Sequence, residues 1–289
     1  MGKQSRYKII IAVLLIIIVA QWVFIAVSRP KSIAKLPSAA KGKIAIVIDD
    51  WGYNLNNLHI IEEIKYPLTA SVLPNLSYSR SIAEQLHKLG FEIILHLPME
   101  PAEKYRLEKN TIMTSFSEKS INDIIDKDLA NIVYAKGVSN HMGSQATSDS
   151  RTMGVVFKKL RERGLYFLDS LVSPQSVCFT LSRKMGLGFA KRDIFLDNIE
   201  DPAYIKGQIA KLKLRARLRG RAIGIGHDRK ITLEVLKEAM PQMEKEGYKF
   251  ITQTDTEIIP HLIDYHYKKT GKFATAFEAT LHELEGAYA

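Results

Sequence analysis

Residues 44–52 read Ile-Ala-Ile-Val-Ile-Asp-Asp-Trp-Gly and join an unbroken apolar run to two adjacent carboxylates. A run rich in β-branched residues is typical of a strand that is buried on both faces of a parallel sheet. Asp49 and Asp50 follow it, where an unpartnered charge would be costly to bury. Consecutive side chains leave a strand on opposite faces, so we expect one carboxylate to bind a cation and the other to handle a proton. An aspartate before a glycine-containing turn is also a common helix N-cap, so the pair alone leaves both interpretations open.

Strand-like and helix-like segments alternate along the rest of the chain. The predicted strands are residues 44–48, 68–73, 91–97, 137–140, 165–168, 188–191, 222–225 and 248–252. The predicted helices are residues 55–64, 79–89, 118–134, 152–163, 174–185, 202–218 and 232–246. Repeated β/α units of this kind favour a parallel sheet, either a closed or distorted barrel or an open doubly wound sheet. In all these folds the chemistry gathers at the carboxyl ends of the strands.

Side chains with metal-binding chemistry stand at those strand ends. His96, His141 and His227 come at or just after predicted strands, whereas the other five histidines fall in predicted helices or in the tail. Charged residues in similar positions are Glu100, Asp169 and Arg192, and Asp197 comes further on, in KRDIFLDN. Aspartate oxygens and imidazole nitrogens suit Zn²⁺ and related divalent ions, so the set predicts a metal site. No G-x-S-x-G elbow and no phosphate-binding G-x-x-x-x-G-K-[ST] loop is present, which argues against a serine hydrolase and a nucleotide-driven enzyme.

The N-terminal region predicts a membrane anchor. Residues 9–27 are almost wholly apolar, and at about 1.5 Å per residue a helix of this length crosses the core of a bilayer. Three basic residues in the segment 1–8 indicate a cytoplasmic tail, with the remainder of the chain on the extracytoplasmic (periplasmic) side of the cytoplasmic membrane. A cleaved signal peptide is the alternative. Residues 28–42 are rich in Pro, Ser, Ala and Lys and read as a flexible linker.

Net charge and cysteine content limit the possible partners and the possible role of the cysteine. The formal net charge is +10, and residues 211–221 alternate basic and apolar side chains on a predicted helix. The simplest interpretation of that segment is the solvated face of an amphipathic helix, and contact with anionic lipid or an acidic polymer is the weaker one. Nothing resembles a nucleic-acid module with interleaved aromatics, so we expect no nucleic-acid partner. Cys178 is the only cysteine, which excludes an intramolecular disulfide, and its apolar surroundings predict a small core residue.

Seven segments in fixed order carry a family resemblance. They are IAIVIDDWG, SVLPN, ILHLPMEP, GVSNHMGS, FLDS, KRDIFLDN and IGIGHD, spread over residues 43–255. In this order the chain resembles the divergent polysaccharide deacetylase family, a branch of the NodB-like carbohydrate esterases. The resemblance implies an α/β fold, a distorted (β/α)7 barrel of NodB type over residues 43–260, with a C-terminal helical tail over 261–289. It also implies a hydrolase, dependent on one divalent metal and commonly on zinc, that removes acetyl groups from an acetylated amino sugar of an envelope or extracellular polysaccharide.

The resemblance also implies a ligand set. In such enzymes the first aspartate of the pair is the general base and the second is a metal ligand, which here are Asp49 and Asp50. The family's His-x-x-x-His-Pro motif reads His96-Leu-Pro-Met-Glu100-Pro in this chain. Either Glu100 is therefore a ligand, or His141 completes the site. Asp50, His96 and His141 are the set we expect, since imidazole is the commoner third ligand.

The same resemblance implies the remaining roles. The late histidine motif corresponds to Ile225-Gly-His227, so His227 would be the general acid. Asp169 is a candidate to orient that histidine. The family's arginine-proline motif, which braces the base, is missing at its usual place, and Arg192 is the candidate substitute.

These departures leave two other functions open. One is a catalytically weak or inactive barrel that serves as a glycan- or protein-binding module of the envelope. The other is a metal-dependent amidase that acts on an amide other than acetamide.

Overall fold

The computed structural model describes residues 41–252, 271–272 and 274–275. Four predicted segments lie wholly or mostly outside these residues: the cytoplasmic tail 1–8, the anchor 9–27, the linker 28–42 and the C-terminal tail 261–289. Within the described part of the chain, no helix is both long enough and apolar enough to cross a bilayer.

A single parallel sheet is the centre of the described domain. Its strands are β1 (Lys43–Trp51), β2 (Thr69–Val72), β3 (Glu92–Met99), β4 (Ala135–Met142), β5 (Tyr166–Asp169), β6 (Phe189–Lys191), β7 (Ile194–Phe195), β8 (Arg221–His227) and β9 (Lys249–Phe250). The helices are α2 (Leu58–Ile61), α3 (Ser79–Lys88), α4 (Glu118–Asn131), α5 (Ser150–Glu162), α6 (Cys178–Met185), α7 (Pro202–Arg219) and α8 (Lys230–Lys245), with a short 3₁₀ turn η1 (Ala146–Ser148). The strand order is β6-β5-β4-β3-β2-β1-β8-β7, and β9 also pairs with β1.

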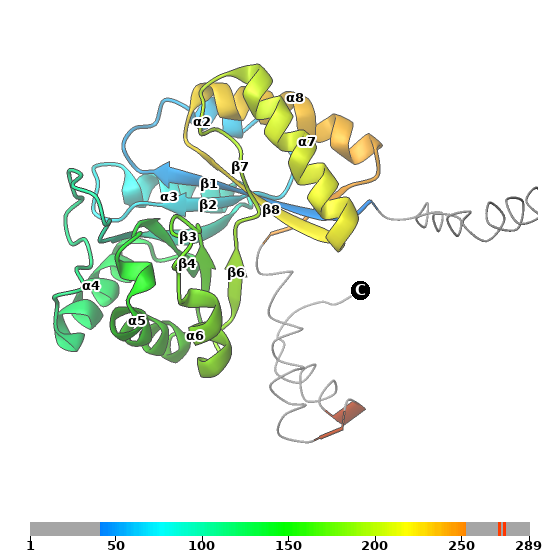
Figure 1. Ribbon diagram of the computed structural model, residues 1–289. Helices are drawn as coiled ribbons and strands as arrows, with labels where there is room; N and C mark the ends of the chain where they lie inside the picture. The colour runs from blue at the N-terminus through cyan, green and yellow to red at the C-terminus, as the bar shows by residue number, and fades with distance from the viewer. Residues whose placement is uncertain (1–40, 253–270, 273, 276–289) are drawn as a thin grey trace, which may run out of the picture. The chain divides into compact units, whose positions relative to one another are not determined.

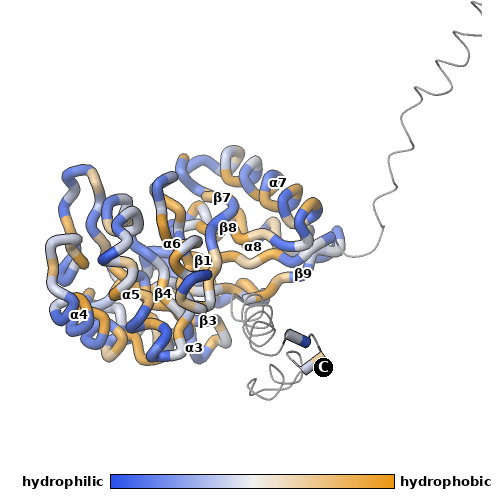
Figure 2. The backbone as a smooth tube through the Cα atoms, turned by 60° about the horizontal axis from the view of Figure 1, so that its bottom comes forward, coloured by the Kyte–Doolittle hydropathy of each residue, from blue (hydrophilic) through white to orange (hydrophobic). Residues whose placement is uncertain are grey.

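The sequence of β1 explains its central place. Ile44, Ile46 and Ile48 pack into the large core that the helices cover, whereas Ala45 and Val47 belong to a smaller apolar cluster on the other face. Both faces of the strand are therefore buried, as the unbroken apolar run predicts. Figure 1 shows the helices around the outside of the curled sheet, and Figure 2 shows hydrophobic positions along its strands and mixed hydropathy along α7.

The two edges of the sheet nearly meet. Only Arg192 and Asp193 separate the edge strands β6 and β7. The backbone N–H of Arg192 donates to the carbonyl of Asp169 in β5 (3.0 Å), and that of Asp193 donates to the carbonyl of Ile223 in β8 (2.9 Å). The strand order also lacks the reversal of a doubly wound sheet. The predicted parallel α/β fold is thus confirmed as a curled, incompletely closed half-barrel.

A few elements differ from the sequence-based prediction. β7 was not predicted, and the helix expected over residues 55–64 is limited to Leu58–Ile61. β3 extends to Met99 and β4 to Met142, so His96 and His141 lie within strands, not at a strand end and in the following loop. Cys178 is buried as a core residue, as predicted.

Candidate metal centre and acid–base site

A β-bulge in β1 shapes the site. Ile48 pairs with Ala70 and Trp51 with Val72, so β1 carries one more residue than β2 over this interval. Within it Asp50 has a φ of 67°, in the left-handed region that non-glycine residues rarely occupy. A bulge re-aims the side chains around it. Asp49 and Asp50 therefore approach the same ring instead of diverging, which corrects the expectation drawn from regular strand geometry.

Both carboxylates face His96. The Nε2 atom of His96 lies 3.2 Å from Oδ1 of Asp50 and 3.7 Å from Oδ2 of Asp49. His141 approaches from the neighbouring strand, with its Nδ1 atom 3.0 Å from the same Oδ1 of Asp50. The two imidazole rings meet edge to face at a centroid distance of 5.0 Å.

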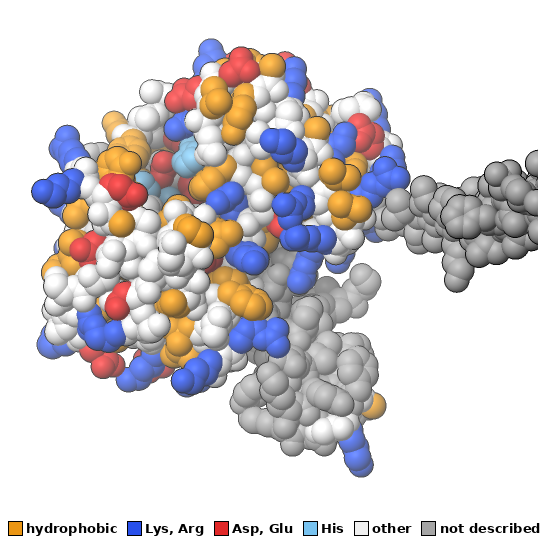
Figure 3. Space-filling view, in the orientation of Figure 1, with side chains coloured by type: hydrophobic (Ala, Val, Ile, Leu, Met, Phe, Trp, Pro, Cys, Tyr) orange, Lys and Arg blue, Asp and Glu red, His pale blue; other side chains and the backbone are white. Residues whose placement is uncertain are grey.

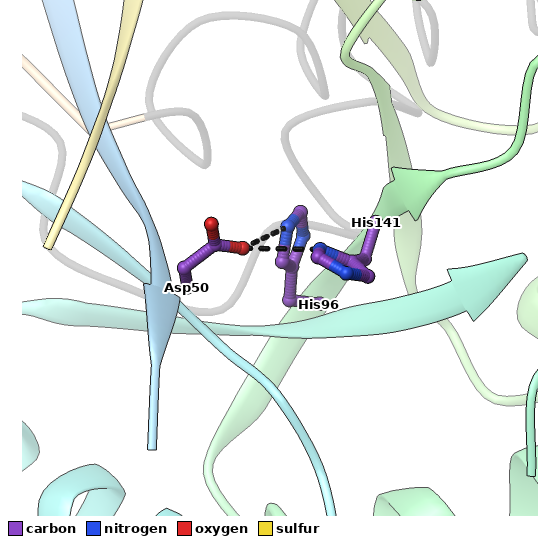
Figure 4. Close-up of side chains that lie close together, drawn as sticks. All are labelled: Asp50, His96 and His141. Carbon is purple, nitrogen blue, oxygen red and sulfur yellow. Dashed lines mark hydrogen bonds and ion pairs between the residues drawn. The ribbon is translucent and has the colours of Figure 1, made fainter. Parts of the chain in front are cut away.

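The structure thus brings together the three predicted ligands. Asp50, His96 and His141 each offer one ligand atom, and these atoms all lie within 4.8 Å of one another. Figure 4 shows the three side chains converging from β1, β3 and β4. One carboxylate and two imidazoles form a donor set that suits a divalent ion with an open coordination position.

Two buried serines support this cluster, and the sequence-based interpretation missed both. The Nδ1 atom of His96 is 2.7 Å from the hydroxyl of Ser139, which lies 2.6 Å from the hydroxyl of Ser71. A partner on Nδ1 fixes the ring so that Nε2 faces the site, as outer partners of metal-binding histidines commonly do. The available signal was a serine on each of two otherwise apolar strands, in SVLPN and GVSNHMGS.

The electrostatics of the two aspartates differ. Burial raises the pKa of Asp49, and the Asp50 charge adds to this while His96 opposes it. Burial would also raise the pKa of Asp50, but interactions with His141 and His96 hold that pKa well below its usual range. Asp49 is only 2% exposed, and its Oδ1 atom has no hydrogen-bond partner among the described residues. A buried carboxylate oxygen without a partner beside a cluster of ligand atoms fits a metal-dependent site in which Asp49 accepts a proton.

His227 stands on the other side of Asp49. It pairs in register with Asp49 across β1 and β8. Its Nδ1 atom lies 2.7 Å from Oδ1 of Asp197, and its backbone N–H donates to Oδ2 of the same carboxylate (2.8 Å). Thr232 donates a further hydrogen bond to that Oδ2 atom (2.7 Å). Burial lowers the pKa of His227, but the Asp197 carboxylate and then Asp50 and Asp49 outweigh it, so the pKa is raised.

Asp197, and not Asp169, therefore orients His227. Asp169 accepts hydrogen bonds from the backbone N–H of Leu171 (2.7 Å) and the hydroxyl of Ser176 (2.6 Å), so its carboxylate holds the loop after β5. The role predicted for Asp169 is wrong for this reason. The signal for Asp197 was its place in KRDIFLDN, directly after the unpredicted strand β7.

Arg192 makes no hydrogen bond or ion pair with Asp49 in the part of the chain that the structure describes. Its Nε and Nη2 atoms donate to the carbonyls of Ser170 (2.7 Å) and Leu171 (2.9 Å). Its guanidinium lies 3.7 Å from the ring centroid of Phe195, and that ring stacks on His227 at 5.8 Å. Arg192 thus reaches the acid side of the site through Phe195. Its interaction with Asp49 is one of charge alone and not the direct bracing contact that the resemblance implied.

Glu100 lies outside the cluster of ligand atoms. Its Oε2 atom accepts hydrogen bonds from the backbone N–H (2.5 Å) and hydroxyl (2.7 Å) of Thr114. Its carboxylate thus stabilises the segment between β3 and α4 by binding Thr114. The geometry therefore favours His141 over Glu100 as the third ligand.

The site is accessible from one face of the molecule. The side chain of His227 is 22% exposed and that of Asp50 is 30% exposed. Figure 3 shows histidine and acidic side chains within a hollow on this face. Tyr53 and Glu108, joined by a hydrogen bond of 2.6 Å, connect the loop after β1 to the segment after β3. Asp50 and His227 are therefore the members of the site that solvent reaches, whereas Asp49 and His96 lie buried behind them.

These residues lie within a region shared with known proteins. The family described as divergent polysaccharide deacetylase matches residues 46–256 of the chain. The chain is 37% identical to the uncharacterized protein YibQ of Escherichia coli K12 over 197 residues, which are 68% of this chain and 62% of YibQ. The chain thus spans less than two thirds of that relative's length.

Two solved structures share the fold. An uncharacterized protein of Agrobacterium tumefaciens C58 matches with a TM-score of 0.69 at 21% identity, over 78% of this chain and 90% of that one. A family 4 carbohydrate esterase of Streptomyces lividans, solved in complex with acetate, matches with a TM-score of 0.50 at 13% identity, over 76% of this chain and 97% of the esterase. At these identities the likeness concerns the fold alone.

Proposed function

Since the chain belongs to the divergent polysaccharide deacetylase family, we propose that it is a metal-dependent hydrolase that removes acetyl groups from an amino sugar of an envelope or extracellular polysaccharide. The observation that carries the proposal is the convergence of Asp50, His96 and His141, with Asp49 beside them and the His227–Asp197 pair on the opposite side. This arrangement provides ligands, a base and an acid within one site.

Asp50, His96 and His141 would hold the metal, for which Zn²⁺ is our candidate. When bound, such an ion supplies Lewis-acid polarisation of the acetyl carbonyl and activation of a water nucleophile. The Oδ1 atom of Asp49, which has no hydrogen-bond partner among the described residues, accepts the proton of the attacking water.

His227 acts as the acid. Asp197 engages the Nδ1 atom, which leaves the Nε2 atom to donate a proton to the departing amine. Because its pKa is raised, the imidazole keeps that proton at a higher pH than an ordinary histidine does. The acid and the base thus lie on adjacent strands, at paired positions of β1 and β8.

Acetate release from acetylated chito-oligosaccharides and peptidoglycan by the full chain tests the proposal, with the metal content of the same sample measured by elemental analysis. We expect Asp49→Asn to retain its metal and lose turnover by a factor of about 10²–10⁴, the usual contribution of a general base. Full activity of this variant on a substrate that the wild type deacetylates would refute the assignment of the base.

A binding module is the second candidate, and two observations favour it. Glu100 stands where the family resemblance implies a second histidine, and Arg192 does not contact the base. On this alternative the domain binds glycan or a partner protein without cleaving it. Metal-loaded wild-type chain that binds glycan but releases neither acetate nor another acyl group across a broad panel supports this candidate.

We also propose that residues 9–27 anchor the chain in the cytoplasmic membrane and that the domain lies on the extracytoplasmic side. The length and apolar character of this segment, with the basic residues before it, support the proposal. Carbonate extraction of membranes and protease accessibility in spheroplasts test it. Release of the chain by carbonate, or protection of the domain in intact spheroplasts, contradicts it.

A further inference from the structure

A row of cations crosses the end of the sheet opposite the site. Lys43 at the start of β1 pairs in register with Arg221 at the start of β8 and with Lys249 at the start of β9. All three side chains are exposed. Like charges placed opposite one another on adjacent strands repel, so the exposed Lys43 and Lys249 side chains favour an anionic partner.

The last part of α7 continues this basic surface. Leu212 and Ala216 are fully buried against the domain, so the opposite side of the helix faces solvent. That side carries Leu214 and Leu218, which are 55% and 65% exposed and lie one helical turn apart. Exposed basic residues flank these leucines: Lys211, Arg215 and Arg217. We call Lys43, Lys211, Leu214, Arg215, Arg217 and Leu218 the basic face.

The composition of this face differs from that of an ordinary solvated helix. Three other cations of α7 have acidic partners: Lys206 with Glu238 (3.2 Å), Lys213 with Glu246 (2.5 Å) and Arg219 with Asp193 (3.3 Å). Exposed leucines between lysines and arginines are typical of helices that lie at a membrane surface, where the apolar chains enter the headgroup boundary and the cations meet anionic lipids. Figure 3 shows Lys and Arg side chains gathered over the C-terminal part of α7, with apolar side chains among them.

The chain also enters the domain at this face. The backbone N–H of Lys43 donates to the carbonyl of Gly220, just after α7, at 2.8 Å. Gly42 packs so tightly on α7 that an added Cβ would lie 2.3 Å from the carbonyl oxygen of Ala216. The proposed anchor is residues 9–27, and the linker 28–42 is short, with an extended reach of roughly 50 Å at most. The bilayer that holds the anchor is therefore within reach of the basic face.

We propose that the basic face binds the anionic phospholipid headgroups of the membrane in which the chain is anchored. The inference rests on the proposed anchor and not on the proposed hydrolysis. Lys43 and Asp50 lie near opposite ends of β1. At about 3.3 Å per residue, they are roughly 23 Å apart. Docking of the basic face thus turns Asp50 and His227 away from the bilayer, toward polymer outside it.

Full-length chain reconstituted into nanodiscs tests the proposal. Leu218→Cys and, as a control at the other end of the sheet, Tyr105→Cys each receive an environment-sensitive fluorophore, and the lipids carry a quencher. Cys178 is buried, so labelled wild type measures the background. We expect quenching at position 218 to be at least twofold greater in discs containing phosphatidylglycerol than in phosphatidylcholine discs, with no such difference at position 105. High salt should remove the difference, because it screens exposed charges.

A charge-matched pair of variants completes the test. Lys211→Gln/Arg215→Gln/Arg217→Gln should abolish the excess quenching, whereas Lys88→Gln/Lys127→Gln/Lys184→Gln removes the same charge elsewhere and should retain it. Equal quenching in both lipids, or failure of the chain to enter the discs, overturns the proposal. Soluble heparin is added to the labelled chain in phosphatidylcholine discs. If it changes the fluorescence at position 218 as much as phosphatidylglycerol does, the face binds an acidic polymer, and the proposal is overturned. Acetate release measured on the same samples keeps the outcome separate from that of the proposed function.

Discussion

The cluster of Asp50, His96 and His141 and the His227–Asp197 pair lie at the same end of the sheet but are constructed differently. In the cluster, Asp50, His96 and His141 come from three strands, and their side chains meet only at the site. In the pair, one carboxylate holds both the ring and the backbone N–H of His227. The cluster therefore depends on each of its members, whereas the pair is a local unit whose loss should leave the cluster intact.

The largest effect is expected for Asp50→Asn. Both imidazoles face the Oδ1 atom of Asp50, so the change removes the only carboxylate of the cluster and its negative charge. Removing a hydrogen-bond partner of a metal ligand typically lowers metal affinity by roughly 10–100-fold. We expect Asp50→Asn to lower it by more than this and to reduce acetate release to background. Calorimetric titration with Zn²⁺ measures the affinity, with the exposed Asp123→Asn on α4 as the control. Stoichiometric metal at wild-type affinity would show that Asp50 is not a ligand.

Asp197→Asn tests whether the His227–Asp197 pair can be disrupted without affecting the cluster. We expect bound metal to be unchanged and turnover to fall about 100-fold, within the usual range for general acid catalysis. The Asp197 carboxylate raises the pKa of His227, so its removal lowers that pKa, and the acid loses its proton at a lower pH. The alkaline limb of the pH–rate profile should therefore move to lower pH. An unmoved alkaline limb would mean that His227 is not the acid.

Ser139→Ala should produce a smaller effect confined to the cluster. The change removes the hydroxyl beside the Nδ1 atom of His96, so the ring loses the contact that fixes its orientation. We expect metal affinity to fall about 10-fold, the lower end of the range for such partners, with the position of the alkaline limb unchanged. If instead the pH profile moves while the affinity holds, the cluster and the pair are coupled through this serine.

Glu100→Gln should have the smallest effect. The amide oxygen of glutamine can still accept the hydrogen bonds from Thr114, and Glu100 lies outside the cluster. We expect metal affinity within about twofold of wild type, since no ligand changes. His141→Gln is the companion variant, and it should lose the metal. The opposite ranking of the two variants would make Glu100 the third ligand.

Much of the fold could be predicted from the sequence because the long apolar runs are buried on both faces. The run in β1 and the alternation that follows it identify a parallel α/β sheet without reference to tertiary contacts. β7 could not be found in this way, since it has two residues and exists through its pairing with β8. Its absence from the prediction left Asp197 without a strand to follow and led to the wrong partner for His227.

The proximity of Asp50, His96 and His141 could be predicted and their detailed geometry could not. His96 and His141 were identified by the apolar runs around them and by the family resemblance. The bulge at Asp50 was not visible, because a positive φ at a non-glycine residue depends on the surrounding fold and not on local preference. Ser71 and Ser139 escaped notice because a single serine on a strand is common and only their mutual contact distinguishes them.

The central position of β1 has a consequence for how the chain reaches its native state. Asp50, His96 and His141 all lie within residues 50–141, on β1, β3 and β4, and these strands belong to the continuous run β1-β2-β3-β4 of the sheet. The other edge of β1 is covered by β8, which begins only at Arg221. Such long-range pairing is slow to form, because a long loop must close first. Until β8 docks, the apolar strand β1 has one unpaired edge, which is a template for aggregation, and the acid of the proposed reaction is not yet beside its base.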